Sequence, residues 1–329
     1  MPLPSAGYVF AEFPWQAQLP DPRSHRLCAA GGGRPASAAG GDCALEGASF
    51  IRAEAPPGDE IVVLAYNVER GFRAAAQVEA LRRDAALPAA DILLLSEVDR
   101  GCSRTGYRNV AADYARALGM CYVFGVEFVE LPRRCGAGGR IAAPCEHGNV
   151  ILSRYPLGNV RLIRHAASVS WRRRMVPLLR LGEPRLGGRV ALAADVKIGE
   201  RYLHVYSVHF ESGRRHGGYR LAQAVELAAD AAARPFGAVI GGDMNTGGYL
   251  ADLRDGAGHK AATRALLERG FVDAHSRLAP ADRATTQSGV AIDLIFGNGD
   301  FFTDAGIGSP AVWGGLSDHL PVWAKVRLG

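Results

Sequence analysis

The sequence predicts an α/β protein in which helices cover the faces of its sheets. Residues 61–66 (IVVLAY) and 91–96 (DILLLS) are short, mostly apolar runs with the length of buried strands. Between them, residues 74–87 (AAAQVEALRRDAAL) carry apolar side chains at helical spacing. Buried strands that alternate with helices are typical of sheets covered by helices. These segments therefore already indicate the fold class.

The same alternation continues to the end of the chain. Further helices are expected at residues 109–119, 219–233 and near 261–269. Further strands are expected at residues 121–126, 149–153, 190–198, 202–208, 238–242, 291–296 and 321–328. Residues 1–58 are rich in Pro, Gly, Ala and Ser, so we expect an irregular N-terminal arm there. With no repeat and no linker beyond it, residues 59–329 are expected to form one domain.

Composition limits the class of protein only loosely. The chain of 329 residues is 48% hydrophobic, which is ample for a buried core. No run approaches the roughly 18–20 consecutive apolar residues of a transmembrane helix. Residues 1–20 lack a basic segment followed by an apolar run, so we expect no signal peptide and a cytoplasmic location. A net charge of +5 and a pI near 9.0 suggest anionic partners.

The cysteines do not predict a structural zinc site, because none of them falls into a CxxC pair. They are Cys28, Cys43, Cys102, Cys121, Cys135 and Cys145. Cys135 and Cys145 flank one Gly-rich loop and Cys28 and Cys43 flank another, so either pair could form a disulfide in an oxidising compartment. Without an export signal, free thiols are the default expectation.

Polar side chains collect at or near the ends of the predicted strands. They are Asn67, Glu69, Glu97, His209, Asp243, Asn245, Asp293, Ser317, Asp318 and His319. Strands that end in such groups bring them to one rim of a sheet. Several carboxylates at one rim would repel one another unless a cation neutralised them. Oxygen ligands without cysteine or paired histidine favour Mg²⁺, or Mn²⁺, over zinc.

Each of these residues also has an ordinary structural interpretation. A single Glu after an apolar run is usually a solvated strand end, and a single His is usually a buried structural residue. Asp243 and Asn245 alone could form an Asx turn with their own backbone. The recurrence of such residues at successive strand ends favours the functional interpretation.

Seven segments together resemble the endonuclease/exonuclease/phosphatase superfamily. In chain order they are NVERG, LLLSEVDRG, HGNVILSRYPL, VHFES, GGDMNT, AIDLIF and LSDHLPV. The resemblance covers about residues 60–329, and GD-x-N with a terminal SDH is its most specific part. It implies a four-layer sandwich, in which two mixed sheets pack face to face with helices outside. It also implies a metal-dependent phosphoesterase.

The resemblance implies three groups of site residues. The metal ligands would be Asn67, Glu97 and Asp318, the catalytic residues Asp243, Asn245, His209, Asp293 and His319, and the substrate contacts Asn149 and Arg154. Asp243 would orient or deprotonate the attacking water, and His319 would touch the scissile phosphate with Asp293 as its partner. Whether the base is Asp243 or the Asp293–His319 pair stays open.

Two positions depart from the nuclease branches of the superfamily. Glu69 stands two residues after Asn67, where an Asn or Asp is expected. No carboxylate partner for His209 can be identified from the sequence.

The substrate class depends on an arginine-rich segment, residues 161–189. It holds Arg161, Arg164, Arg172, Arg173, Arg174, Arg180, Arg185 and Arg189 against one acid, Glu183. The segment is either a solvated loop or strand edge, or a guanidinium surface suited to phosphates. We expect Mg²⁺-dependent hydrolysis of a nucleic acid or a related phosphodiester. The alternatives are a phosphatase or phospholipase acting on inositol phosphates or sphingolipids, and a catalytically silent protein that only binds a phosphorylated ligand.

Overall fold

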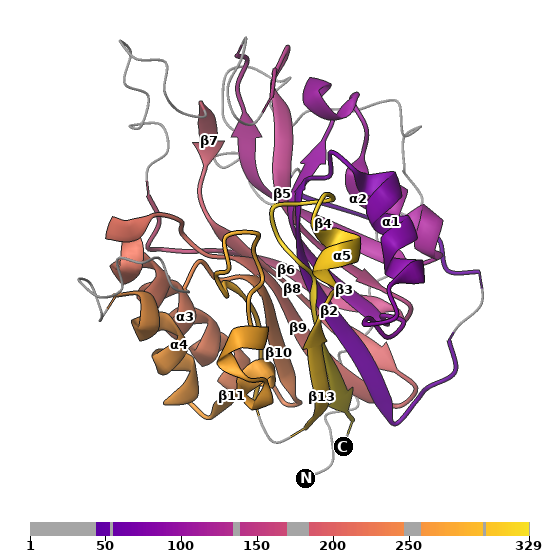
Figure 1. Cartoon of the computed structure of the whole chain (residues 1–329), viewed down its shortest axis with the longest axis vertical. Coiled ribbons are helices and arrows are strands. Elements are labelled where there is room, and N and C mark those ends of the chain that lie inside the picture. Colours follow the sequence, from indigo (N-terminus) through magenta and orange to yellow (C-terminus); the bar gives the residue numbers. More distant parts are fainter. Residues whose placement is uncertain are drawn as a thin grey trace.

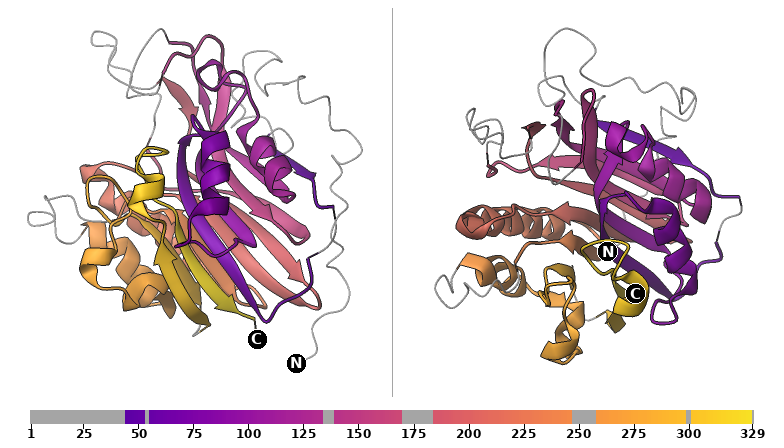
Figure 2. Two further views of the ribbon diagram at one scale, coloured as in Figure 1. Left: turned by 45° about the vertical axis from the view of Figure 1, so that its right-hand side comes forward. Right: turned by 45° about the horizontal axis from the view of Figure 1, so that its top comes forward.

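The chain forms four layers, in which two β-sheets pack face to face and helices cover the outer face of each sheet (Figures 1 and 2). The computed structural model describes residues 44–52, 55–133, 139–169, 184–246, 258–298 and 301–328. The predicted α/β class and the four-layer fold implied by the resemblance are both confirmed. Among the described residues, no helix is long and apolar enough to cross a membrane.

One sheet has eight strands and the other has six. The larger sheet consists of β1 (Leu45–Ser49), β4 (Cys121–Glu130), β5 (Cys145–Ser153), β3 (Ile92–Arg100), β2 (Glu60–Arg70), β14 (Val322–Arg327) and β13 (Phe302–Ile307) in that order, with β7 (Arg185–Gly187) paired to β4. The smaller sheet has the order β11 (Phe271–Asp273), β12 (Asp293–Asn298), β10 (Ala238–Asp243), β9 (Arg201–His209), β8 (Val190–Ile198) and β6 (Leu157–Arg164).

The helices lie in two groups, one on each outer face (Figure 2). They are α1 (Ala74–Arg83), α2 (Val110–Leu118) and α5 (Pro310–Trp313) on the larger sheet, and α3 (Gly217–Ala232) and α4 (Gly258–Leu267) on the smaller one. Both faces of a central strand are therefore buried. In β2, Val62 and Leu64 pack toward the helices, whereas Ile61 and Val63 pack toward the second sheet. This explains why β2 has a continuous apolar run instead of an alternating one.

Two parallel strand pairs determine where the functional groups lie. β2 runs parallel to β3 in the larger sheet, and β9 runs parallel to β10 in the smaller sheet. The carboxyl ends of each pair therefore carry Asn67 and Glu97 on one sheet and His209 and Asp243 on the other. Face-to-face packing then brings the two sets to the same rim.

The sheet begins earlier than the sequence indicated. Leu45–Ser49 lies within the predicted arm, yet it forms β1 and pairs antiparallel with Cys121–Gly125 of β4. The segment is short and mostly small or polar, so it lacks the apolar run that marks the central strands. Residues 1–43 of the predicted arm lie outside the described residues.

The first helix is shorter than predicted and ends at Arg83. Asp84 adopts an extended conformation, and its carboxylate accepts hydrogen bonds from the Ser309 amide at 2.9 Å and from Trp313 Nε1 at 2.7 Å. These bonds to residues more than 200 positions away stop the helix, and no local pattern could reveal them.

A disulfide joins Cys102 to Cys145. The expectation of free thiols is therefore wrong for these two residues, and Cys145 cannot pair with Cys135. The two cysteines are 43 residues apart and meet because β3 and β5 are antiparallel neighbours. Cys121 is a buried free thiol, and the other three cysteines lie outside the described residues.

Removing this disulfide should destabilise the fold. The Cys102→Ala/Cys145→Ala variant should lose about 2–4 kcal/mol of unfolding free energy, because the crosslink restricts the unfolded chain. Denaturant titration of the wild type and the double variant, each with and without reductant, measures this loss. Reductant should lower the wild-type midpoint and leave that of the variant unchanged. Equal wild-type midpoints in both conditions would contradict the expectation.

Candidate functional site

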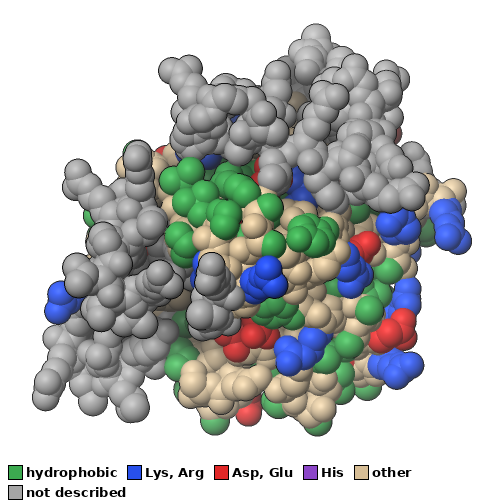
Figure 3. Space-filling view, turned by 90° about the horizontal axis from the view of Figure 1, so that it is seen from above, with side chains coloured by type: hydrophobic (Ala, Val, Ile, Leu, Met, Phe, Trp, Pro, Cys, Tyr) green, Lys and Arg blue, Asp and Glu red, His purple; other side chains and the backbone are tan. Residues whose placement is uncertain are grey.

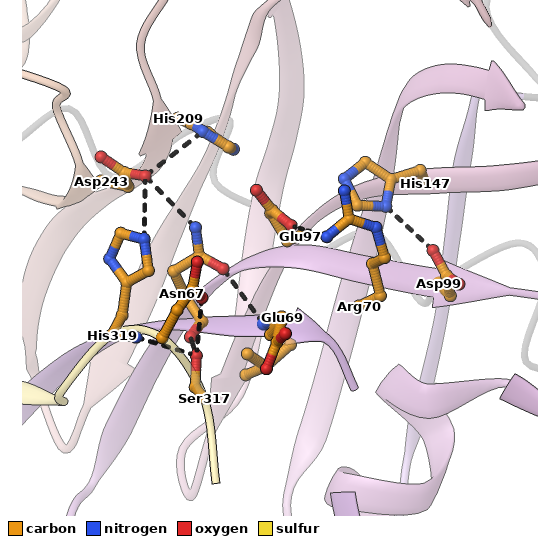
Figure 4. Close-up of polar contacts among 12 residues, drawn as sticks. Asn67, Glu69, Arg70, Glu97, Asp99, His147, His209, Asp243, Ser317 and His319 are labelled. Atoms are coloured by element: carbon orange, nitrogen blue, oxygen red, sulfur yellow. Dashed lines mark hydrogen bonds and ion pairs between the residues drawn. The ribbon is translucent and has the colours of Figure 1, made fainter. Parts of the chain in front are cut away.

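The polar residues predicted at the strand ends meet at one rim between the two sheets (Figure 4). The larger sheet contributes Asn67 and Glu97, and the smaller sheet contributes His209 and Asp243. His319 comes from the loop before β14, which Ser317 fastens to the larger sheet by donating a hydrogen bond to the Asn67 carbonyl at 2.8 Å.

The backbone is irregular where the larger sheet enters the site. β-Bulges shift the register between Asn67 and Arg70 and between Leu95 and Val98. Glu69, Arg70 and Glu97 have positive φ angles of 47°, 62° and 56°. Such angles in residues other than glycine cost about 1–3 kcal/mol each and cluster at functional sites. Bulges next to a site change the direction of side chains. Here the two bulged segments contain Glu69, Arg70 and Glu97.

Asp243 lies at the centre of the site and contacts three of its side chains. Its Oδ2 accepts a hydrogen bond from Asn67 Nδ2 at 3.2 Å and lies 3.3 Å from His209 Nε2 and 3.8 Å from His319 Nε2. Its Oδ1 accepts the Asn245 amide at 2.9 Å, so the Asx turn considered from the sequence does form. Burial raises the pKa of Asp243 to about 7. A carboxylate with such a pKa can accept a proton near neutral pH.

Asp293 and His319 form a buried pair. His319 Nδ1 lies 2.8 Å from Asp293 Oδ2, and Asp293 is opposite Asp243 in the antiparallel β10–β12 ladder. Burial opposes protonation of the ring, but the charges of Asp293, Asp243 and Asp318 raise the pKa of His319 well above its ordinary value. The imidazole is therefore cationic at neutral pH.

His209 has the opposite electrostatic behaviour. Burial and the positive charge of Arg189 hold the pKa of His209 well below its ordinary value, so this ring is neutral. Its Nε2 faces Asp243, which provides a carboxylate neighbour that the sequence did not reveal. Its Nδ1 is buried and has no hydrogen-bond partner in the part of the chain that the structure describes.

Glu97 lies among basic side chains. Its Oε2 accepts a hydrogen bond from Arg70 Nη1 at 2.9 Å. Burial disfavours the charged carboxylate, but the positive charge of Arg70 holds the pKa of Glu97 well below its ordinary value. Arg70 and His147 were missed in the sequence, although both lie inside the segments that carry the family resemblance. Their positions in NVERG and HGNVILSRYPL were the available signal.

Several groups could hold a cation. Ligand atoms of Asp243, Asp293 and His319 lie within 4.8 Å of one another and form a candidate metal-binding group. Asn67 and Glu97 add oxygen atoms at the same rim, and Asp318 is exposed beside His319. These oxygen donors suit Mg²⁺ or Mn²⁺.

Carboxylates crowd the outer side of this rim. Burial and the negative charges of Asp318 and Glu97 raise the pKa of Glu69, although Arg73 and Arg70 counteract them. A divalent cation would relieve this repulsion. The donor set is therefore suited to a divalent cation.

Comparison with known proteins identifies the family. The sequence profile of the Endonuclease/Exonuclease/phosphatase family matches residues 64–319. The chain belongs to this family. The family consists of metal-dependent phosphoesterases, and its members are generally hydrolytic. No curated protein sequence matches the chain.

Solved structures of this family share the fold. An endonuclease/exonuclease/phosphatase from Beutenbergia cavernae DSM 12333 superposes with a TM-score of 0.64 at 18% identity, covering 82% of this chain and 72% of that one. A family member from Leptotrichia buccalis C-1013-b has a TM-score of 0.52 at 14% identity, with coverages of 81% and 99%. D. rerio TDP2 complexed with a single-strand DNA product has a TM-score of 0.51 at 15% identity, with coverages of 82% and 99%.

The two predicted substrate contacts lie in different places. Asn149 is buried on β5, where its Nδ2 donates to the Val190 carbonyl of β8 at 3.0 Å. Arg154 follows the last residue of β5, and Ser153 pairs with the first residue of β3. Arg154 therefore lies at the opposite end of β3 from Glu97, and it pairs with Asp91 at 3.1 Å. The structure does not bring Arg154 to the Asp243 cluster.

The described arginines of segment 161–189 are mostly bound within the protein. Arg161 pairs with Asp230 at 2.7 Å. Arg185 and Arg189 are buried on the larger-sheet side, with Glu130 at 3.5 Å and Glu127 at 2.5 Å. Seen from above, the described Lys and Arg side chains are dispersed rather than gathered in one patch (Figure 3). Arg172, Arg173, Arg174 and Arg180 lie outside the described residues.

The opposite protonation of His319 and His209 can be measured in metal-free protein. We expect the His319 ring to be protonated at pH 7.5 and the His209 ring to stay neutral, as read from imidazole nitrogen and carbon shifts in NMR. Asp293→Asn should lower the pKa of His319 by about 1–3 pH units, because it removes the adjacent charge. His204, whose partner is Asp195, serves as the unaffected reference. Ordinary titration of His319 in the wild type would contradict this assignment.

Proposed function

We propose that this family member hydrolyses a phosphodiester in a Mg²⁺-dependent reaction, with a nucleic acid or a nucleic-acid-related ester as substrate. The observation that carries the proposal is the buried Asp293–His319 pair, whose Nε2 faces Asp243 at 3.8 Å. A cationic imidazole and a carboxylate able to accept a proton thus lie together at a rim rich in carboxylates. These are the groups that water attack on a phosphate needs.

Asp243 is proposed as the base that orients and deprotonates the attacking water. Its pKa of about 7, which burial raises, leaves it ionised in a useful fraction at neutral pH. Asn245 follows in the same turn, and its Nδ2 donates to the Phe210 carbonyl at 3.1 Å, which fixes the side chain beside the base. Asn245 is therefore proposed to hold the phosphate or the nucleophile.

His319 is proposed to touch the scissile phosphate. Asp293 holds the ring through Nδ1 at 2.8 Å, so Nε2 is the nitrogen available to a phosphate oxygen. The protonated ring offsets negative charge that develops on the phosphate. His209 is proposed as a second, neutral imidazole on the same anion. Donors held in position in a buried site are effective because they need no reorganisation during the reaction.

Asn67, Glu97 and Asp318 are proposed to hold Mg²⁺, for which Mn²⁺ could substitute. When bound, the cation polarises a phosphoryl oxygen and stabilises negative charge. Glu97 fits this role because its low pKa keeps the carboxylate ionised despite burial, Arg70 being the nearest of the charges that stabilise it.

Support for a nucleic-acid substrate comes from the related fold of D. rerio TDP2, which was solved with a single-strand DNA product. The intact acid–base set supports an enzyme over a protein that only binds a phosphorylated ligand. A panel of plasmid DNA, single-stranded RNA, bis-p-nitrophenyl phosphate, an inositol polyphosphate and sphingomyelin, each with Mg²⁺ or EDTA, tests the proposal. If the wild type hydrolyses none of these compounds, the proposal is rejected.

Two substitutions test the acid–base roles. His319→Gln and Asp243→Asn should each lower kcat by about 10²–10⁴-fold, because each removes a positioned proton-transfer or charge-stabilising group. His204→Gln is the matched control, since His204 is also buried against an aspartate, Asp195, but belongs to the α3 face of the smaller sheet. Its kcat should match the wild type. Near-wild-type turnover of either site variant would remove that residue from the mechanism.

Glu97→Gln tests the metal assignment. This variant should require about tenfold or more Mg²⁺ for half-maximal activity, because a neutral amide is a weaker ligand than a carboxylate. Glu226→Gln is the control, since Glu226 pairs with His165 on the α3 face. Mg²⁺ titrations of turnover and of thermal midpoint give two measures of the same affinity. An unchanged Mg²⁺ requirement would show that Glu97 is not a ligand.

A further inference from the structure

A second Asp–His pair lies on the far side of Glu97 from Asp243 and His319 (Figure 4). His147 on β5 is directly opposite Asp99 on β3, and its Nδ1 lies 2.9 Å from Asp99 Oδ1. The exposed fraction of the His147 side chain is 2%, and that of Asp99 is 0%. The two residues therefore form a buried pair of the same kind as His319 and Asp293.

The partners of Asp99 determine which nitrogen of His147 carries a proton. Arg104 donates from Nε at 2.6 Å and from Nη2 at 2.7 Å to the two oxygens of Asp99. Paired with this guanidinium, Asp99 is a carboxylate that only accepts hydrogen bonds, so Nδ1 of His147 is the donor. Asp99 does not engage Nε2, which is therefore available to another partner.

His147 faces the space between the sheets. Residues two apart on a strand share a face, so His147 points the same way as Asn149. Asn149 donates to the Val190 carbonyl of the smaller sheet, which fixes this direction. Val190 precedes Ala191, the residue opposite Val208, so Asn149 meets the smaller sheet next to His209.

Among the described residues, the buried polar atoms without a hydrogen-bond partner include Nδ1 of His209 and Oδ1 of Asn149. Buried polar atoms are nearly always bonded, so unpaired ones close together point to a ligand or water that completes them. Together with Nε2 of His147, they give a polar lining on the Glu97 side of the site, away from His319.

His204 shows what a purely structural buried histidine looks like in the same chain. Its Nδ1 contacts Asp195, and its Nε2 lies 3.1 Å from Arg161 Nη2, so both ring nitrogens have partners. His147 shares the burial and the aspartate, but Asp99 leaves its Nε2 available to another partner. A histidine whose two ring nitrogens both have partners has a structural role, whereas one with an available nitrogen can bind a ligand.

We infer that His147 is a further substrate-contacting residue, whose Nε2 forms a hydrogen bond with a phosphate oxygen. The inference rests on the proposed phosphoesterase function and deepens it. The anion would then contact His319, His209 and His147, of which His319 and His147 are each oriented by an aspartate. Arg104 is a positioning residue, because it acts on the phosphate only through Asp99 and His147. No covalent step is assigned to His147.

The test compares His147→Gln with His204→Gln in the presence of Mg²⁺. Loss of one charge-assisted hydrogen bond should lower kcat/KM on bis-p-nitrophenyl phosphate by about 10–100-fold in His147→Gln. Inorganic phosphate, titrated by calorimetry, should bind that variant about tenfold or more weakly than the wild type. His204→Gln should match the wild type in both measurements. Thermal midpoints of both variants control for folding.

A second measurement does not depend on any variant folding. In the wild type, added inorganic phosphate should shift the Nε2 resonance of His147 and leave that of His204 in place. The inference is overturned if His147→Gln turns over substrate and binds phosphate like the wild type, or if the Nε2 resonance does not respond. If the wild type nevertheless hydrolyses the substrate, the proposed function is unaffected. A wild type without turnover rejects the proposed function, and the phosphate titration still decides the role of His147.

Discussion

The site depends on one buried carboxylate, that of Asp243, which is contacted from both sheets. A buried ionisable group is costly unless hydrogen bonds or opposite charges compensate it. Here Asn67 comes from the larger sheet, His209 from the smaller sheet and His319 from the loop before β14. These contacts exist only when the two sheets are packed. The same interaction therefore joins the layers and assembles the catalytic groups.

Opposite environments give chemically similar side chains different roles. His319 faces Asp293, Asp243 and Asp318 and is cationic, whereas His209 is buried near Arg189 and is neutral. Glu97 is ionised among basic groups, whereas burial raises the pKa of Asp243 to about 7. One acid, one base and one anionic ligand thus lie within a single rim. Environments that separate the pKa values of neighbouring groups are the usual means of assigning such roles.

Much of the fold and most of the site were predictable from local patterns. The apolar runs at β2, β3 and β10 have both faces buried, so their sequences identified them as strands. The polar residues just after those runs predicted the rim where Asn67, Glu97 and Asp243 meet. Edge strands such as β1 and β13 were missed because they are short or partly exposed and carry no such run. Each of these predictions rests on neighbours within about ten residues.

The sequence by itself determined the strand–helix alternation, the residue types at the strand ends and the demand for a cation. Tertiary structure decided the partners. Only packing brings Cys102 to Cys145, directs Arg70 to Glu97, pairs His147 with Asp99 and separates Arg154 from the site. It also buries Arg185 and Arg189, which the sequence alone could have placed on a surface. The reason is physical: pKa values, ion pairs and crosslinks depend on distances in space, and sheet register sets these distances between residues far apart in the chain.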